Sequence, residues 1–236
     1  MAEDEEKSLS EGSETVIRAN KKSAKQLRVA LKYVDGLPTA YTCNFRLANE
    51  LSESMRAKIW ELINGNMSEL CANSSLGWNA LDKQQELFDP LARYIILNPV
   101  GQSDQIAGYS VLRFEHEAEE DILYCYELQI SPLHQRKGLG KFLMKLLEVI
   151  GRRTKMEKIM LTVLDNNSAA NDFYATIGSL DECSPSFEDP ENEGDTEKAG
   201  DEFVATFFDT VNTGNMIYGG RFSGTSYSAV ATYVHN

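Results

Sequence analysis

A strand, a glycine-rich turn and a helix follow one another over residues 122–150, and this succession constrains the fold more than any other feature of the sequence. Residues 122–130 are rich in aromatic and branched apolar side chains and end at a Ser-Pro pair, which is typical of a largely buried strand. After Gly140, apolar residues recur at offsets of three, four and seven. They are Leu143, Leu146, Leu147 and Ile150. This spacing predicts a helix with one apolar face.

The turn between these elements, Gln135 to Gly140, predicts an anion site. Gly138 and Gly140 would let the backbone approach a ligand closely, and the N–H groups of a first helical turn have no partners within the helix. The helix dipole favours a phosphate at this end. Three cations flank the turn, namely Arg136, Lys137 and Lys141. Neither of the common nucleotide-binding glycine motifs occurs in the sequence, so a tightly packed helix N-terminus is the alternative interpretation.

The turn and a later segment, Asn167-x-x-Ala170-x-x-Phe173-Tyr174, resemble the GCN5-related N-acetyltransferase (GNAT) superfamily. Within it, the sequence is most similar to the N-alpha-acetyltransferase D type, which acetylates the N-terminal serine of histones. Four segments carry this closer resemblance: Leu-Gly-Trp at 76–78, Tyr-Cys-Tyr-Glu-Leu-Gln at 124–129, Arg-Lys-Gly-Leu-Gly-Lys-Phe-Leu at 136–143 and Met-Leu-Thr-Val at 160–163. The resemblance extends over roughly residues 16–180.

The patterns and the resemblance together predict an α/β protein with the GNAT fold, a mixed, mostly antiparallel central sheet with helices on both faces. We expect strands at 40–47, 93–97, 107–115, 122–130 and 158–164. We expect helices at 16–34, 51–63, 67–73, after Gly140 and at 167–177, with 83–88 as a loop or helical turn. Because a helix lies between them, strands 122–130 and 158–164 should run parallel.

The ends of the chain differ in composition from its middle. Residues 1–15 are acidic and poor in apolar residues, which predicts a disordered tail, and residues 16–180 form the expected acetyltransferase domain, beginning with a basic helix that packs on it. A nuclear-import or docking role for that helix is the alternative. Residues 181–202 hold ten acids against one lysine, and 203–236 mix aromatic residues with Gly, Ser and Thr. We expect 181–236 to be largely disordered, because this segment does not match the closing strands of the family; pairing of 203–236 as strands is the alternative.

The net charge of −13 argues against direct binding to nucleic acid and favours a basic partner. The four cysteines and three histidines are scattered without metal-ligand spacing, so we expect reduced thiols and no metal. No apolar run is long enough for a membrane span, and the acidic N-terminus is unlike a signal peptide. We therefore expect a monomeric protein of the nucleus and cytoplasm that does not bind a membrane.

Acetyl transfer to an amine requires a base, because an α-amine with a pKa of about 7.7 to 8.0 is largely protonated at cellular pH. Glu127 is the best candidate in the sequence, since an acid in a central strand ahead of a phosphate turn is rare without a partner or a task. The alternative is a carboxylate that pairs structurally with a cation. The resemblance also implies that Glu127 is the general base.

The resemblance implies the remaining acetyl-CoA contacts. The backbone of Leu128, Gln129 and Ile130 would hold the pantetheine arm, and residues of the turn would hold the pyrophosphate: Gln135, Arg136, Lys137, Gly138, Leu139, Gly140 and Lys141. Asn167 and Asn171 would add contacts to the cofactor. Tyr174 matches the position near the leaving thiolate, where its phenol would donate a proton; helix packing is the alternative.

The acceptor implied by the resemblance is the Ser-Gly-Arg-Gly N-terminus of histones 4 and 2A. Glu115 and Glu117 match its acidic peptide-site positions and would bind the arginine, although they could equally be solvated charges. Trp78, Tyr124 and Tyr126 match other peptide-site positions, with a core anchor as the alternative for Trp78. Strict alternation would place both tyrosines opposite Glu127, so we assume a β-bulge in this strand.

Two other functions remain open from the sequence. A lysine or polyamine acetyltransferase of the same fold would also use an acidic groove, but a lysine amine, with a pKa of about 10.4, needs stronger deprotonation. A non-catalytic GNAT-like binding protein is the other possibility, because the C-terminal segment departs from the family pattern.

Overall fold

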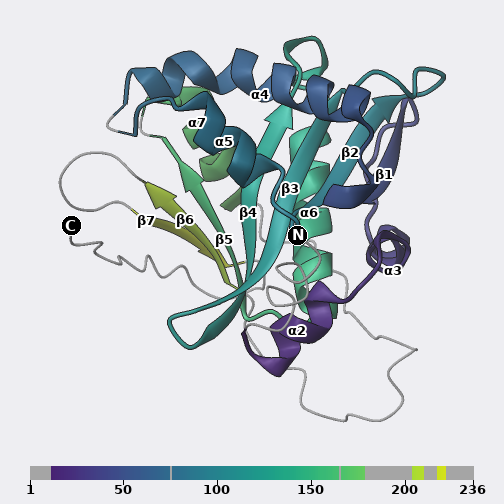
Figure 1. Cartoon of the computed structure of the whole chain (residues 1–236), viewed down its shortest axis with the longest axis vertical. Helices are drawn as coiled ribbons and strands as arrows, with labels where there is room; N and C mark the ends of the chain where they lie inside the picture. Colours follow the sequence, from purple (N-terminus) through teal and green to yellow (C-terminus); the bar gives the residue numbers. More distant parts are fainter. Residues whose placement is uncertain (1–11, 75, 165, 179–203, 210–216, 222–236) are drawn as a thin grey trace.

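The computed structural model of this protein describes residues 12–74, 76–164, 166–178, 204–209 and 217–221 (Figure 1). Its strands form one seven-stranded sheet in the order β1 to β7. The strands are β1 Tyr41–Leu47, β2 Arg93–Pro99, β3 Gly108–Glu117, β4 Glu120–Ile130, β5 Lys158–Val163, β6 Val204–Asp209 and β7 Ile217–Arg221. Neighbouring strands are antiparallel except β4 with β5 and β5 with β6, which are parallel. The predicted mixed, mostly antiparallel α/β fold is confirmed, as is the parallel pairing across the central helix.

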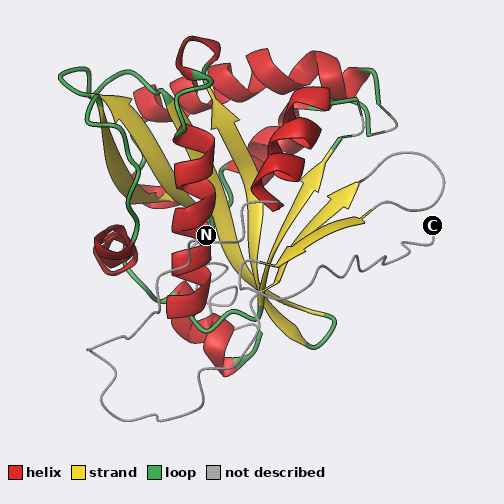
Figure 2. Ribbon diagram, turned by 180° about the vertical axis from the view of Figure 1, so that it is seen from behind, coloured by secondary structure: helices red, strands yellow, loops and turns green. Residues whose placement is uncertain are grey.

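Helices cover both faces of this sheet, as Figures 1 and 2 show from opposite sides. The helices are α2 Glu14–Asn20, α3 Ala24–Leu27, α4 Glu53–Ala72, α5 Ala80–Leu87, α6 Leu139–Arg153 and α7 Ser168–Gly178. One core lies between the sheet and α2, α3, α6 and α7, and a second lies between the sheet and α4 and α5. No helix in the described ranges is long and apolar enough to cross a membrane.

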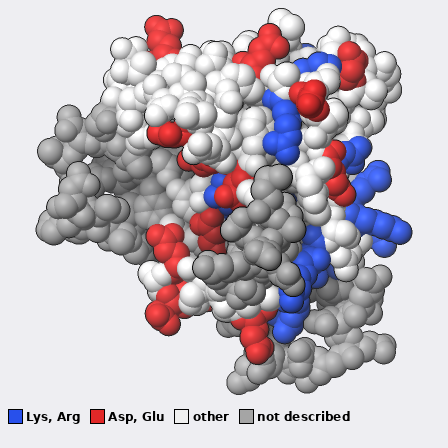
Figure 3. All heavy atoms as spheres, viewed as in Figure 1, with Lys and Arg blue, Asp and Glu red and all other residues white. Residues whose placement is uncertain are grey.

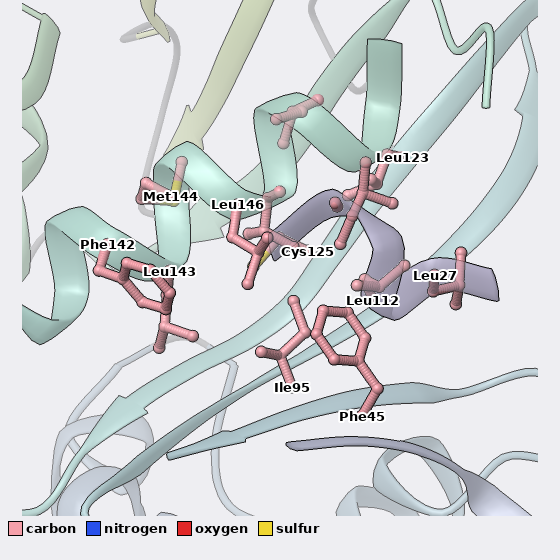
Figure 4. Close-up of a cluster of buried hydrophobic side chains, with 14 of the residues drawn as sticks. Leu27, Phe45, Ile95, Leu112, Leu123, Cys125, Phe142, Leu143, Met144 and Leu146 are labelled. Carbon is pink, nitrogen blue, oxygen red and sulfur yellow. The ribbon is translucent and has the colours of Figure 1, made fainter. Parts of the chain in front are cut away.

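The helix α6 packs as its apolar periodicity predicts. Leu143, Leu146, Leu147 and Ile150 are all buried against the sheet. Figure 4 shows side chains of α6 meeting Leu112 of β3 and Leu123 and Cys125 of β4. Burying an aliphatic side chain of this size contributes about 1.5–3 kcal/mol, so this face holds the central strand and the turn before α6 in one rigid unit.

The single basic helix expected at 16–34 is wrong. The chain forms α2 and α3, which break around Lys21, and then a 3₁₀ turn at Arg28–Tyr33. Ser23 causes the break, because its side chain accepts from the backbone of Gln26 while the Gln26 side chain accepts from the Ser23 backbone, a capping box that starts a new helix. Order also begins before residue 16, since Ser13 caps α2 and donates to Asp121 of β4 at 2.7 Å.

The two helices expected at 51–63 and 67–73 are one continuous helix, α4. A Gly-Asn pair reads locally as a break, but Asn66 instead donates to the Gln129 side chain of β4 at 2.9 Å, which fixes the helix on the sheet. Residues 83–87 belong to the helix α5, with Phe88 as its C-cap, and Asn79 caps the start of this helix by accepting from the backbone of Leu81 and Asp82. The helices predicted from the sequence on this face were shorter than α4 and α5.

Within 181–236 the structure describes two strands, β6 and β7, which pair antiparallel with each other; the expected disorder of the rest lies outside the described residues. β6 adds to the free edge of β5 in parallel register. An uncovered β5 would expose a row of unpaired backbone groups, which gives a physical reason for a closing hairpin at this edge. The acidic run at 181–202 and most of the tail expected at 1–15 lie outside the described residues.

Candidate active site

The central strand β4 contains a β-bulge at Tyr126. Val111 of β3 pairs with Glu127, whereas the next residue, Leu112, pairs with Cys125, so Tyr126 is the extra residue on β4. The assumed bulge is therefore confirmed. Cys125 lies in the core beneath α6 and Tyr126 packs on the core beneath α4 and α5, as regular alternation requires, but the bulge interrupts the alternation at the next residue. Glu127 also faces α5, so the bulge brings Tyr126 and Glu127 to one side.

The strands β4 and β5 separate immediately before this bulge. Their parallel pairing runs from Ile122 to Cys125 and includes no later residue of β4, although β4 continues to Ile130. Figure 1 shows the two strands diverging along their length. Backbone groups of residues 126–130 therefore have no ladder partner in β5. The expected pantetheine contacts, Leu128 to Ile130, lie along this stretch.

The carboxylate of Glu127 is buried, with 7 % of the residue exposed, and both of its oxygens have partners. Lys83 of α5 lies 2.6 Å from Oε1, and the Gln129 side chain donates to Oε2 at 2.8 Å. Lys83 also contacts Glu86 on its own helix. The structure thus contains the cationic partner that the alternative interpretation of Glu127 required, and it places that pair beside the separated strands.

The surroundings of Glu127 shift the pKa of this carboxyl and of two neighbouring side chains. Burial raises the pKa of the Glu127 carboxyl, and the Lys83 ammonium opposes that rise. Burial lowers the pKa of Lys83, but the carboxylates of Glu127 and Glu86 outweigh it, so the pKa of Lys83 ends above its ordinary value. Burial also raises the pKa of the Tyr174 phenol, and the charges of Cys125 and Glu127 raise it further. Tyr174 therefore keeps its proton at neutral pH and is a potential donor.

The turn before α6 has the geometry of a ligand cradle. Gly138 is the N-cap of α6 in the left-handed conformation, with φ of 79°, and no side chain caps the helix. A Cβ added at Gly138 would meet no atom of the chain within 4 Å. Arg136 is also left-handed, with φ of 59°, and it is exposed together with Gln135, Lys137 and Lys141. Free first-turn N–H groups, an open backbone and exposed cations fit a bound anion.

The two glycines of the turn have different reasons to be glycine. A Cβ on Gly140 would lie 2.9 Å from the ring of Phe173, so Gly140 allows α6 and α7 to pack closely. The packed-helix alternative therefore holds for Gly140, whereas Gly138 faces open space. Leu139 is buried in the core, so any contact it makes with a ligand uses its backbone.

The predicted peptide-site residues of β3 and β4 lie together. Tyr126 donates to Glu115 at 2.7 Å, and its ring centre lies 4.7 Å from that of Tyr124. Burial raises the pKa of the Glu115 carboxyl, which the bond from Tyr126 opposes. Glu117, at the end of β3, is exposed. Arg113 lies with its guanidinium carbon 4.1 Å from the centre of the Tyr126 ring, so a cation of the protein already stands beside this group.

The other predicted contacts have structural partners. Asn167 accepts from the backbone of Ala170 at 3.1 Å, so it caps α7. Asn171 donates to the Leu164 carbonyl at 3.3 Å. Trp78 stacks on Trp60 of α4, with ring centres 5.8 Å apart, and is half-buried rather than a fully buried anchor. These contacts fix the positions of the three side chains. Their contacts with acetyl-CoA or with the peptide remain predictions.

Sequence reasoning missed two residues of the site. Lys83 appeared only in a polar stretch expected to be a loop or turn, and Asn66 fell between two expected helices. Asn66 holds Gln129, which in turn holds Glu127. No local pattern marked either residue, because their partners lie far along the chain.

The sequence model of the Acetyltransferase (GNAT) family matches residues 59–178, which is more than half of the chain. The chain belongs to this family. GNAT enzymes transfer an acetyl group from acetyl-CoA, and the match contains the bulged strand, the turn and α7. This protein is therefore a GNAT acetyltransferase with the family fold.

Several solved structures described as acetyltransferases are similar to this chain. An aminoglycoside acetyltransferase from an uncultured soil metagenomic sample has 16 % sequence identity, with a TM-score of 0.44 over 65 % of this chain and 97 % of that one. A ribosomal-protein-alanine N-acetyltransferase from Brucella melitensis biovar Abortus 2308 has 12 % identity, with a TM-score of 0.45 over 64 % and 99 % of the two chains. A possible acetyltransferase from Clostridium difficile 630 has 13 % identity, with a TM-score of 0.45 over 64 % and 97 %.

The chain's own residues fit acetyl-CoA. The open space at Gly138 and the exposed cations around it suit the pyrophosphate, and the gap between β4 and β5 suits an extended arm that pairs with backbone. Within the described ranges, no group of three or more His, Cys, Asp or Glu side chains is arranged to hold a metal ion.

Proposed function

We propose that this GNAT enzyme acetylates the N-terminal α-amine of proteins that begin Ser-Gly-Arg-Gly, with acetyl-CoA as donor and histones 4 and 2A as substrates. The observation that carries the proposal is the bulge of β4, which places Tyr126 and Glu127 on one side beside the gap between β4 and β5. Tyr124 and Glu115 adjoin them. The motif resemblance to the N-alpha-acetyltransferase D type supports the choice of an N-terminal amine. Such substrates would place the enzyme in the nucleus and cytoplasm.

Each of these residues has a role in the proposed mechanism. Acetyl-CoA supplies an activated acyl group when it is bound. The turn at Gly138 and the backbone of residues 128–130 orient the donor, and Glu127 takes the proton of the acceptor amine directly or through water. A backbone N–H beside the gap polarises the carbonyl. Tyr174, whose pKa is raised by burial, keeps a proton to give to the leaving thiolate.

The acidic groups at the ends of β3 and β4 would select a basic peptide. Figure 3 shows Asp and Glu side chains along the upper edge and toward the centre and lower left of the face in view, with Lys and Arg mainly toward its right side. Glu115 is already bonded to Tyr126 and has Arg113 nearby, whereas Glu117 is exposed. A substrate guanidinium would therefore meet less competition at Glu117 than at Glu115.

Neutralising the acidic pair with Glu115→Gln and Glu117→Gln should raise KM for a Ser-Gly-Arg-Gly peptide by about ten-fold or more, the scale of a bond to a charged group. Each variant lacks the charge that would hold the arginine. For a Ser-Gly-Ala-Gly peptide the change should be small, and Glu117→Gln alone should account for most of the effect. Steady-state kinetics with both peptides measures this. Equal changes for the two peptides would return these glutamates to the solvated-surface interpretation.

The acceptor itself is tested by incubating the protein with acetyl-CoA and a lysine-containing Ser-Gly-Arg-Gly peptide, free or chemically blocked at its N-terminus. Mass spectrometry should locate the acetyl group on the α-amine of the free peptide, and the blocked peptide should remain unmodified. Acetylation of lysine in the blocked peptide, or of spermidine in a parallel reaction, would favour the lysine or polyamine alternative. Calorimetric binding of acetyl-CoA without any transfer would favour a non-catalytic binding protein.

A further inference from the structure

We propose that Lys83 is a positioning residue of this enzyme, which holds the buried Glu127 ionised and correctly oriented to accept the proton of the acceptor amine. The inference rests on the proposed role of Glu127 in β4 and extends it to a residue of the helix α5.

A chain of contacts across three elements supports this role. Asn66 of α4 donates to the Gln129 side chain at 2.9 Å, and Gln129 donates to Oε2 of Glu127 at 2.8 Å. Lys83 of α5 lies 2.6 Å from the other oxygen, and Glu86 holds the same ammonium from the next turn of α5. Both carboxylate oxygens of Glu127 therefore have a polar partner, and these contacts fix the orientation of the remaining lone pairs.

Lys83 also supplies the positive charge that stabilises the ionised form of Glu127. A buried carboxylate with 7 % exposure tends to protonate unless a cation compensates the lost hydration. In the part of the chain that the structure describes, five other titratable groups act on Glu127 or are acted on by it: Cys71 of α4, Glu86 of α5, Tyr109 of β3, Cys125 of β4 and Tyr174 of α7.

None of these five groups can replace Lys83. Burial raises the pKa of both cysteines and both tyrosines, so they are neutral at pH 7, and Glu86 is an acid that raises the pKa of Glu127. Among the described residues, Lys83 is therefore the cation that compensates Glu127. The raised pKa of Lys83 also keeps its own amine protonated, so that it does not compete with the substrate amine for acetyl transfer.

The sign of the expected pH effect follows from this arrangement. A general base works in its deprotonated form, so kcat/KM rises as the pH passes through the pKa of Glu127. An opposite charge at this distance lowers a carboxyl pKa by about one to three pH units. Removing Lys83 therefore moves the acidic limb of the pH profile upward, and activity at neutral pH falls.

The test uses the full-length protein with Lys83→Met and Lys83→Gln, which remove the charge while preserving most of the side-chain length. Both variants should move the acidic limb of kcat/KM for a Ser-Gly-Arg-Gly peptide upward by about one to three pH units. Activity should recover at high pH. Lys83→Arg should keep the limb near its original position. The control Lys58→Met removes a lysine that pairs with the exposed Asp104, and its profile should stay unchanged.

Two results would overturn the inference. One is a folded Lys83→Gln protein whose acidic limb has not moved. The other concerns the double variant. If Lys83→Gln still shifts the acidic limb of the kcat/KM profile in a protein that already carries Glu127→Gln, Lys83 acts on another group. If neither neutral variant folds, the ¹³C spectrum of labelled glutamate in the wild-type protein decides the matter, since a Glu127 carboxyl that is protonated at neutral pH contradicts the role. Normal activity of Glu127→Gln would instead refute the proposed base and leave the Lys83 contact purely structural.

Discussion

Replacing Glu127 with Gln should lower kcat at neutral pH by about a hundred- to ten-thousand-fold, the usual range for loss of general-base catalysis. Gln preserves the shape of the side chain but cannot accept the proton of the acceptor amine. Because the carboxylate faces α5 rather than the turn before α6, the affinity for acetyl-CoA should change little. Steady-state kinetics with a Ser-Gly-Arg-Gly peptide measures kcat, and calorimetry measures binding of acetyl-CoA.

The pH dependence separates this role from a structural one. Raising the pH should partly rescue Glu127→Gln, because more of the acceptor amine then loses its proton without help. Glu61→Gln, on the exposed side of α4, is a matched control and should retain normal kcat. A folded Glu127→Gln protein with near-normal kcat would refute this role and leave Tyr124, Tyr126 or water as candidates for the general base. Loss of folding in that variant would support the structural ion pair with Lys83.

Gly138→Asp should reduce acetyl-CoA affinity by about a hundred-fold or more, because like charges brought together cost several kcal/mol. The new side chain would occupy the open space at the N-terminus of α6, where the pyrophosphate is expected. A non-glycine residue at φ of 79° also adds strain of about 1–2 kcal/mol, which a folded domain of this size should tolerate. Calorimetric titration with acetyl-CoA and a thermal melt measure the two effects.

Two alanine variants serve as controls for this result. Gly138→Ala introduces the strain without the charge, so it should weaken binding much less. Gly140→Ala should lower Tm instead, because its Cβ would meet the ring of Phe173 at 2.9 Å. Phe173→Leu should relieve part of that loss by opening space between α6 and α7. Unchanged acetyl-CoA affinity in a folded Gly138→Asp protein would remove the cofactor assignment from this turn.

The unit formed by β4, the turn and α6 was predictable because its signals are local. Apolar residues at helical spacing face one side of a helix wherever that helix packs, so Leu143, Leu146 and Leu147 had to be buried if α6 formed. The glycine at 138 marked the turn, and the structure gives it the left-handed conformation, which glycine adopts with little steric cost. The strands of the antiparallel meander were likewise visible from their composition.

Helix boundaries were less predictable because they depend on competition between neighbouring side chains and distant contacts. Ser23 and Gln26 together stop one helix and start another, although the apolar pattern continues across them. Asn66 has the opposite effect. Its local preference is to end a helix, but its bond to Gln129 keeps α4 continuous. Tertiary contacts decided both cases.

The sequence by itself determined that the chain would build a GNAT sheet with a glycine-rich turn after its central strand and that Glu127 would lie in that strand. Only the tertiary structure decided what Glu127 faces. The bulge at Tyr126 reverses the expected alternation, and α5 brings Lys83 within 2.6 Å of the carboxylate. Register and helix docking depend on contacts between residues far apart in the chain, and no local pattern of side chains encodes them.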